Sequence, residues 1–229
     1  MAPNDFLPII TNNLAVDFPE LRHYILYNST KILSYRNNEK ISFSTPSELL
    51  YLVNGKVKSY ILTPNGGEKL VYIFVRDTII FQSFSNRFFK TLIACDDTTA
   101  FFISESLISK FLQTNTTFIE KYIALIKERS TIMLSQVFSD SNQSARQKVL
   151  SFLISLANSF GVSQENGTLI ITEMPTLTDL AALINVHRTN VSTYINELEK
   201  MQIIERQKKA LIIKDLQALQ RKLDETEAE

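Results

Sequence analysis

The segment 176–201, TLTDLAALINVHRTNVSTYINELEKM, constrains the fold of this chain more than any other stretch. Its apolar spacing predicts a short helix that begins at residue 176 or 178 and ends at 183, followed by a second helix over about 188–201. Asn185 lies between them, where the backbone needs a positive φ that Asn tolerates next best after Gly. This arrangement predicts a helix-turn-helix unit, with an ordinary helical hairpin as the alternative.

The second helix of this segment has two different faces. Val191, Ile195 and Leu198 are spaced to pack inward. Polar side chains that hydrogen-bond to base edges and phosphates make up the outward row: Arg188, Thr189, Ser192, Thr193 and Asn196. The row therefore predicts a recognition helix that enters the major groove of double-stranded DNA.

A β-hairpin is predicted directly after the second helix. Two short β-branched runs, 203–205 and 211–213, flank a charged turn. A hairpin in this position is a wing, and its basic tip predicts phosphate contacts from Arg206, Lys208 and Lys209. The alternative is a merely solvated turn, because acidic residues slightly outnumber basic ones in the C-terminal part of the chain.

The bulk properties of the chain exclude several classes of protein. With 229 residues, zero formal net charge and 45% hydrophobic residues, the chain can form two domains with real cores. No apolar run reaches the length of a membrane span, and the start MAPNDFLPII lacks the pattern of a signal peptide, so we expect a cytoplasmic protein without a membrane partner. The single Cys95 excludes an intrachain disulfide, and its strand-like surroundings favour a small buried residue over a redox sensor.

The stretch 48–104 is rich in short strands and turn signals. LLYLV (49–53) and KVKSYIL (56–62) are separated by Asn54-Gly55, which predicts a hairpin between them. A second turn leads into EKLVYIF (68–74), and two further strands are predicted at TLIAC (91–95) and TAFFIS (99–104). This spacing predicts a barrel or sandwich, with a helix over 18–27 packed on its outside.

A long helix is predicted over 117–139, which contains neither Gly nor Pro. Alternating steps of four and three make a coiled-coil seam of Ile119, Ile123, Ile126, Ser130, Met133 and Val137. A second apolar strip lies beside it, at Phe118, Tyr122, Leu125 and Ile132. A helix at the surface of a domain needs only one apolar strip. The presence of two strips therefore predicts that the second strip packs on the helix's own domain and the seam on a partner chain. The alternative is a helix buried in a monomer.

These pieces, in this order, resemble the Crp/Fnr family of bacterial transcription regulators. The segments LLYLVNGKVKSYILTPNGGEKLVYIF and TLTDLAALINVHRTNVSTYINELEKMQIIERQKKALIIKD are similar to the family's leading hairpins and DNA-binding unit, and the likeness covers nearly the whole chain. It implies an α+β fold: a β-roll, or cupin-like double-stranded jelly roll, over 1–115, a dimerisation helix over 116–139 and a winged helix-turn-helix domain over 140–229. It also implies a homodimer on a near-palindromic DNA site and RNA polymerase as a partner.

The start of the recognition helix departs from the family pattern. Members usually carry Arg-Glu/Val-Thr-Val-Ser/Gly-Arg, where this chain reads RTNVST. The resemblance assigns base contacts to Arg188, Thr189, Ser192 and Thr193. Thr189 and Thr193 replace the glutamate and the final arginine, so we expect a DNA half-site that differs from the family's familiar ones. Phosphate contacts are implied for Thr176, Thr178, His187 and Asn190.

The effector segment departs further from the family pattern. Members that bind cyclic AMP use a Gly-Glu-Leu turn followed by Arg-Ser or Arg-Thr, and the aligned stretches here are Ile80-Phe81-Gln82 and Lys90-Thr91. Loss of the glycine and of the ribose carboxylate argues against a cyclic nucleotide, whereas Lys90 remains as an anion partner. The implied effector site consists of Tyr72, Phe81, Gln82, Lys90 and Thr91.

Other cofactors of the family are not expected either. Oxygen-sensing members use four cysteines and haem-binding members use His or Cys ligands, whereas this chain offers only Cys95, His23 and His187. We therefore expect no iron-sulfur cluster, haem or other metal, and an unknown anionic or aromatic small molecule as effector. EKLVYIF resembles the subgroup of anaerobe regulators that sense chlorinated aromatic acids.

Catalysis is not expected of this chain. The sequence contains no cluster of His, Cys and carboxylates, no nucleophile elbow and no Gly-rich phosphate loop, and its five glycines leave little room for one. The alternative to a sensing regulator is a ligand-independent DNA-binding or protein-interaction regulator with a degenerate effector pocket.

Overall fold

The computed structural model describes residues 9–10, 19–45, 47–62, 68–81, 89–165, 167–172, 174–208 and 210–227. The chain divides into two compact units, one of Pro8–Ser130 and one that contains Thr131–Glu229. The division falls inside the long helix α4, Thr116–Asn142.

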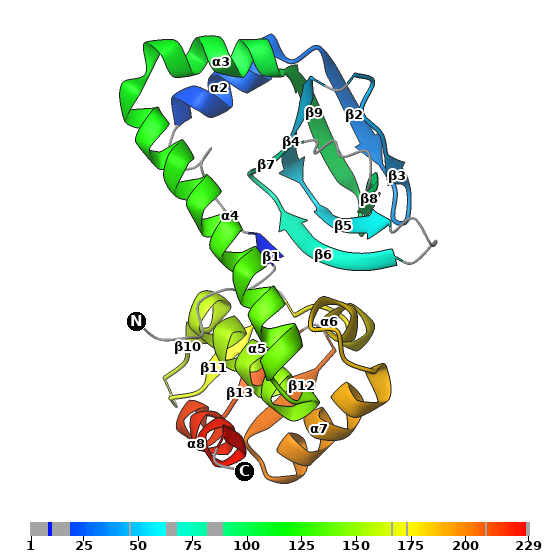
Figure 1. Cartoon of the computed structure of the whole chain (residues 1–229), viewed down its shortest axis with the longest axis vertical. Helices are drawn as coiled ribbons and strands as arrows, with labels where there is room; N and C mark the ends of the chain where they lie inside the picture. Colours follow the sequence, from blue (N-terminus) through cyan, green and yellow to red (C-terminus); the bar gives the residue numbers. More distant parts are fainter. Residues whose placement is uncertain are drawn as a thin grey trace. The chain divides into compact units, whose positions relative to one another are not determined.

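The first unit is a roll of two facing sheets (Figure 1). One sheet has the strand order β1-β6-β5-β8-β3, and the other has the order β2-β9-β4-β7. The strands are β1 (Ile9–Ile10), β2 (Lys31–Tyr35), β3 (Lys40–Ile41), β4 (Glu48–Asn54), β5 (Lys56–Leu62), β6 (Glu68–Val75), β7 (Thr78–Phe81), β8 (Phe89–Ala94) and β9 (Thr98–Ser104). The structure thus confirms the predicted roll and adds the short strands β1, β2, β3 and β7, which the sequence pattern did not indicate.

The predicted hairpin at Asn54-Gly55 is wrong. Strand β4 pairs with β7 and β9 in one sheet, whereas β5 pairs with β6 and β8 in the other. Gly55 has φ of +89°, so the turn does need a glycine, but it carries the chain from one sheet to the other. A Cβ at Gly55 would lie 2.7 Å from Oδ1 of Asp96, because the turn packs against the connection between β8 and β9.

Helices α2 (Pro19–Asn28) and α3 (Glu105–Thr114) pack on the outside of the sheet that contains β4. Leu49 and Tyr51 of β4 join Leu21, Phe111 and other apolar side chains in this cluster. The four residues 49–52 are all buried, because helices cover one face of β4 and the roll interior covers the other. This double burial explains why the strand reads as a continuous apolar run.

The long helix α4 has the two strips that its sequence predicts. Phe118 is fully buried with Tyr122 packed beside it, and Ile132 is also buried. The side chains of the seam are 36–65% exposed in the single chain: Ile119, Ile123, Ile126, Met133 and Val137. Leu134 and Phe138 are exposed next to the seam, so this surface of α4 is wider than predicted. The side chain of Leu125 lies outside the described residues.

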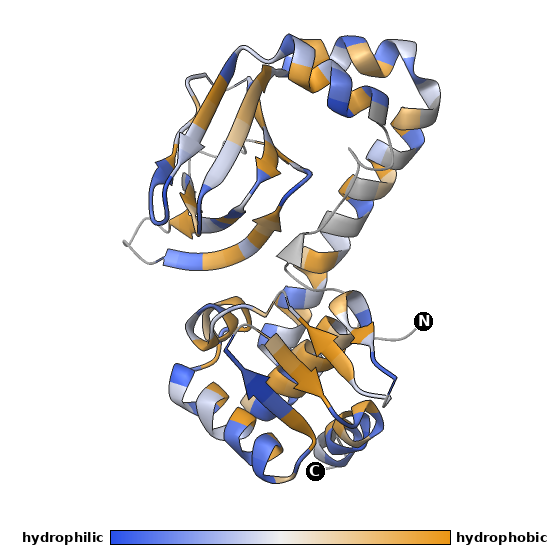
Figure 2. Ribbon diagram, turned by 180° about the vertical axis from the view of Figure 1, so that it is seen from behind, coloured by the Kyte–Doolittle hydropathy of each residue, from blue (hydrophilic) through white to orange (hydrophobic). Residues whose placement is uncertain are grey.

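The second unit is a winged helix-turn-helix domain. Its strands form a sheet of order β10-β11-β13-β12, in which β12 is a hydrophilic edge strand beside apolar neighbours (Figure 2). The elements are α5 (Ala145–Phe160), β10 (Val162–Ser163), β11 (Leu169–Ile171), α6 (Leu177–Leu183), α7 (Arg188–Lys200), β12 (Ile204–Gln207), β13 (Ala210–Ile213) and α8 (Leu216–Glu227). The domain therefore combines an α6–α7 helix pair, its wing and a supporting helix, α5, which was not among the predicted elements.

Helix α5 is the central buried helix of this domain. A capping box begins it: Oγ of Ser144 accepts from the Gln147 N–H, and Oε1 of Gln147 accepts from the Ser144 N–H. Its residues 148–150 and 152–157 are buried, and it packs against α7 and α8. Among the described residues, no helix is long and apolar enough to cross a membrane.

Candidate nucleic-acid interface

The first helix of the predicted unit begins at a hydroxyl cap. Thr176 is the N-cap of α6, and its Oγ1 accepts from the Asp179 N–H at 3.1 Å and donates to Oδ2 of Asp179 at 2.8 Å. Of the two helix starts that the sequence allowed, residues 176 and 178, the structure shows the one at Thr176. Thr176 and Thr178, both predicted phosphate contacts, are exposed at this end of the helix.

The turn between the two helices has the predicted left-handed residue. Asn185 has φ of +54°, and the next residue, Val186, donates its N–H to the carbonyl of Ala181 at 3.0 Å. The turn lets α7 cross α6 while Leu180, Ala181 and Leu183 stay buried. Local sequence signals were sufficient here, because the cap and the turn residue each act through neighbours in the chain.

Helix α7 presents the predicted polar row to solvent. Val191 and Ile195 are fully buried and Leu198 is 4% exposed, so they fix the helix against the domain core. The predicted base contacts lie on the opposite side, with Arg188, Thr189 and Thr193 exposed and Ser192 half-buried. The row can therefore approach a groove without unpacking the domain.

The N-terminal end of α7 joins two residues with different predicted roles. His187 is the N-cap residue, and its Nδ1 lies 2.8 Å from Oγ1 of Thr189. Asn190, a predicted phosphate contact, is exposed one residue further on. The imidazole of His187 therefore controls which way the Thr189 hydroxyl points.

Arg206 of the wing is held by the recognition helix. Its backbone N–H donates to Oε1 of Glu199 at 2.8 Å, and its Nε donates to Oε2 of Glu199 at 2.9 Å. Its Nη2 also donates to Oε2 of Glu199, and to Oδ1 of Asn196 at 2.6 Å. From the sequence, Arg206 was predicted to contact a DNA phosphate. The sequence pattern did not indicate its bonds to Glu199 and Asn196, because these bonds join strand β12 to helix α7 across a turn.

The other charged residues of the wing differ in their surroundings. Lys208 is exposed near the tip of the hairpin, and Lys209 lies outside the described residues. Lys214 lies 2.8 Å from a carboxylate oxygen of Glu205. This hydrogen bond holds the pKa of the Glu205 carboxyl below its usual range.

The predicted effector residues are partly brought together in the first unit, where Phe81 packs with Tyr122 against the cluster under α2 and α3. The ring of Phe81 meets that of Tyr122 edge-on at 5.7 Å, and Tyr72 lies 5.7 Å from Phe74. Lys90 Nζ donates to the carbonyl of Phe81 at 2.7 Å and lies 5.5 Å from the centre of the Phe74 ring. Sequence reasoning missed Phe74 and Tyr122, although Phe74 shares the strand face of Tyr72 and Tyr122 belongs to the second apolar strip of α4.

Thr91 and Gln82 complete the list of predicted effector residues. Thr91 follows Lys90 in β8 and pairs with Tyr60 of β5. Gln82 lies outside the described residues.

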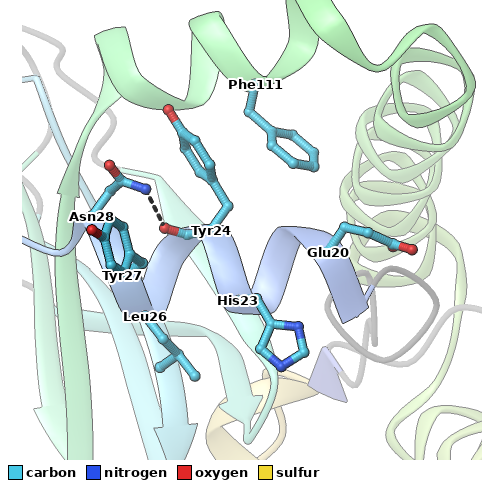
Figure 3. A pocket seen from close by; sticks show the side chains of 7 residues that line it. All are labelled: Glu20, His23, Tyr24, Leu26, Tyr27, Asn28 and Phe111. Carbon is cyan, nitrogen blue, oxygen red and sulfur yellow. Dashed lines mark hydrogen bonds between the residues drawn. The ribbon is translucent and has the colours of Figure 1, made fainter.

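His23 lies on α2 and lines a groove at the surface. This open groove of about 790 Å³ runs along α2. Figure 3 shows the side chains that line it: Glu20, His23, Tyr24, Leu26, Tyr27, Asn28 and Phe111. Tyr24 donates its hydroxyl to the carbonyl of Leu107 in α3, and Asn28 Nδ2 donates to the Tyr24 carbonyl. Within the described part of the chain, no three His, Cys, Asp or Glu residues are grouped so as to hold a metal ion.

The domain with the exposed row matches a known family. Residues 147–222 match the Crp-like helix-turn-helix domain. The chain is also 25% identical over 190 residues to ycf28 of Porphyra purpurea, whose name describes an HTH-type transcriptional regulator; the match covers 81% of this chain and 78% of that protein. Fold, helix row and family match define a helix-turn-helix DNA-binding protein.

Solved structures share the fold along most of the chain. CprK complexed with OCPA has a TM-score of 0.76 and 19% identity, covering 95% of this chain and all of that one. A CooA variant from Carboxydothermus hydrogenoformans has a TM-score of 0.76 and 20% identity, covering 93% and 96% of the two chains. FixK2 from Bradyrhizobium japonicum has a TM-score of 0.69 and 16% identity, covering 83% and 96%. These likenesses show that the chain shares its fold with CprK, CooA and FixK2, and the family match is to the Crp-like helix-turn-helix domain over residues 147–222.

Proposed function

We propose that the chain is a homodimeric, sequence-specific regulator that reads DNA with α7 and responds to a small molecule in its roll. The observation that carries this proposal is the exposed polar row of α7 opposite the buried Val191, Ile195 and Leu198. Base contacts come from Arg188, Thr189, Ser192 and Thr193. Phosphate contacts come from Thr176, Thr178, His187, Asn190 and Lys208, together with Lys209 outside the described residues.

Dimerisation would cover the exposed seam of α4. Ile123 and Ile126 are 46% and 47% exposed, and Val137 is 65% exposed, although all three are apolar. Pairing of two α4 helices through these positions removes the seam from water. A twofold dimer then reads a near-palindromic site with two α7 helices in adjacent major grooves. RNA polymerase as a partner and a cytoplasmic location belong to this proposal.

The proposed effector is an anionic or aromatic small molecule. Lys90 supplies a cation 5.5 Å from the centre of the Phe74 ring, and its Nζ donates to the backbone carbonyl of Phe81, whose own ring meets that of Tyr122. An ammonium group beside ring faces and edges suits an aromatic anion. CprK, the neighbour complexed with OCPA, is consistent with a ligand-responsive member of this fold. Binding would change the populations of two states of the dimer.

Two experiments test the proposal. Arg188→Ala should abolish specific binding to a duplex selected by the wild-type protein, while sedimentation still shows a dimer. Arg221→Ala removes an exposed cation of α8 in the same domain and should leave the affinity unchanged. A retained mobility shift with Arg188→Ala would contradict the assignment of α7. For the sensor, mass spectrometry should recover a small molecule other than cyclic AMP from purified protein.

A second candidate is a ligand-independent regulator. It is favoured by Lys90, because the ammonium group already donates to the Phe81 carbonyl within the chain. Equal affinity for the selected duplex before and after addition of a cell extract supports this candidate, and an affinity changed by the extract supports the sensor. Neither candidate involves catalysis.

A further inference from the structure

Arg206 makes four hydrogen bonds to side chains of α7. Its guanidinium donates to one carboxylate oxygen of Glu199 through Nε and Nη2, and its backbone N–H donates to the other oxygen. The same Nη2 donates to Asn196 Oδ1 at 2.6 Å. Strand β12 is thereby fastened to the last turns of α7 by charge-assisted hydrogen bonds.

Glu199 lies on the same face of α7 as the predicted recognition row. Positions 188, 192, 196 and 199 are spaced by four, four and three residues, which places them along one stripe of a helix. A carboxylate on this stripe repels DNA phosphates if its charge is not balanced. Arg206 supplies the balancing charge, so part of its contribution to DNA affinity passes through Glu199.

Asn196 is oriented by the same guanidinium. A guanidinium has donors only, so the amide atom that faces it must be the oxygen. The Asn196 amide N–H groups therefore point away from Arg206, and the residue is exposed on the recognition face. They can donate to a phosphate or to an acceptor on a base edge.

We propose that Arg206 is a positioning residue that neutralises Glu199 and orients Asn196, which becomes a further DNA contact at the C-terminal part of α7. This inference rests on the proposed function, because it assumes that α7 enters the groove. It replaces the phosphate contact that the sequence predicted for Arg206.

The test is a double-mutant cycle on DNA affinity. Full-length protein is titrated against a duplex selected by the wild type, with fluorescence anisotropy read at several KCl concentrations. Arg206→Gln should weaken binding roughly tenfold, because it leaves the Glu199 carboxylate facing phosphate. In a Glu199→Gln background the same change should weaken binding clearly less than tenfold, because only the orientation of Asn196 is then lost.

Lys208→Gln is the matched control on the same hairpin. Lys208 is an exposed cation with a predicted phosphate contact, so its loss should be equal in both backgrounds and lower the salt slope by about one. If Arg206→Gln behaves like this control, Arg206 is a phosphate contact and the proposal is overturned. Circular dichroism and urea unfolding show whether each variant is folded.

Two further variants keep the proposal falsifiable if Arg206→Gln does not fold. Arg206→Lys keeps the positive charge but loses the planar guanidinium that bonds to Glu199 and Asn196 together. A several-fold loss of affinity is therefore expected, and full affinity overturns the proposal. Asn196→Ala should weaken binding several-fold, and unchanged affinity removes Asn196 as a contact. A wild type that selects no duplex overturns the proposed function itself, whereas selection with an additive cycle overturns only the role of Arg206.

Discussion

Nδ1 of His187 and Oγ1 of Thr189 lie 2.8 Å apart at the start of the recognition helix. The bond joins a predicted phosphate contact to a predicted base contact, so His187 sets the direction of the hydroxyl that Thr189 presents. His187→Ala should therefore broaden the base preference at the position read by Thr189, as measured by selection from randomised half-sites. Asn190→Ala should instead weaken binding evenly across sequences. An unchanged preference with His187→Ala would show that the bond plays no part in base reading.

Removal of the Thr176 side-chain cap should lower the stability of the fold. Thr176→Ala removes the acceptor for the Asp179 N–H and the donor to its carboxylate, and should lower the free energy of unfolding by about 1 kcal/mol. Urea denaturation measures this loss. Thr176→Ser retains the hydroxyl and should lose far less. Equal losses for the two variants would mean that the methyl group, rather than the cap, matters.

The seam of α4 predicts the oligomeric state. Ile123→Asp places a charge in an interface that excludes water, so it should convert dimer to monomer at micromolar concentration in analytical ultracentrifugation. Ile32→Asp is the control, because Ile32 is 56% exposed on β2, outside the seam. A dimer that survives Ile123→Asp would place the interface elsewhere.

The Glu199–Arg206 pair predicts a pH dependence of stability. Hydrogen bonds from Arg206 hold the pKa of the folded Glu199 carboxyl below its usual range, so the pair stabilises the fold while pH exceeds the unfolded value of about 4.3. This contribution is lost as pH falls through the lowered folded pKa. The difference in unfolding free energy between wild type and Glu199→Gln should therefore be constant near neutral pH and shrink in acid. A difference that stays constant down to pH 3 would show that Arg206 does not perturb Glu199.

The helix-turn-helix unit could be predicted from sequence because its signals are local. The cap at Thr176, the left-handed Asn185 and the apolar period of α7 each act within a few residues. All three signals specify the same helix-turn-helix structure, so the sequence predicts it consistently. A similar local signal was present for α5, since Ser144 and Gln147 have the spacing of a capping box.

Pairings between distant segments could not be predicted in the same way. The glycine at Gly55 indicated a turn correctly, but turn chemistry does not choose which strands pair on either side of it. The bonds from Arg206 to Glu199 and Asn196 depend on the position of strand β12 beside helix α7. The spacing of side chains within α7 does not predict that position. The polar row was therefore predicted, while the contacts that orient its far end required the structure.

Hydroxyl-radical footprinting of the wild-type protein on its selected duplex tests the central claim most directly. The account predicts two protected half-sites of related sequence, centred about 10 base pairs apart on one face of the helix, and loss of both with Arg188→Ala. A single protected segment, or a double footprint that survives Arg188→Ala, would contradict it.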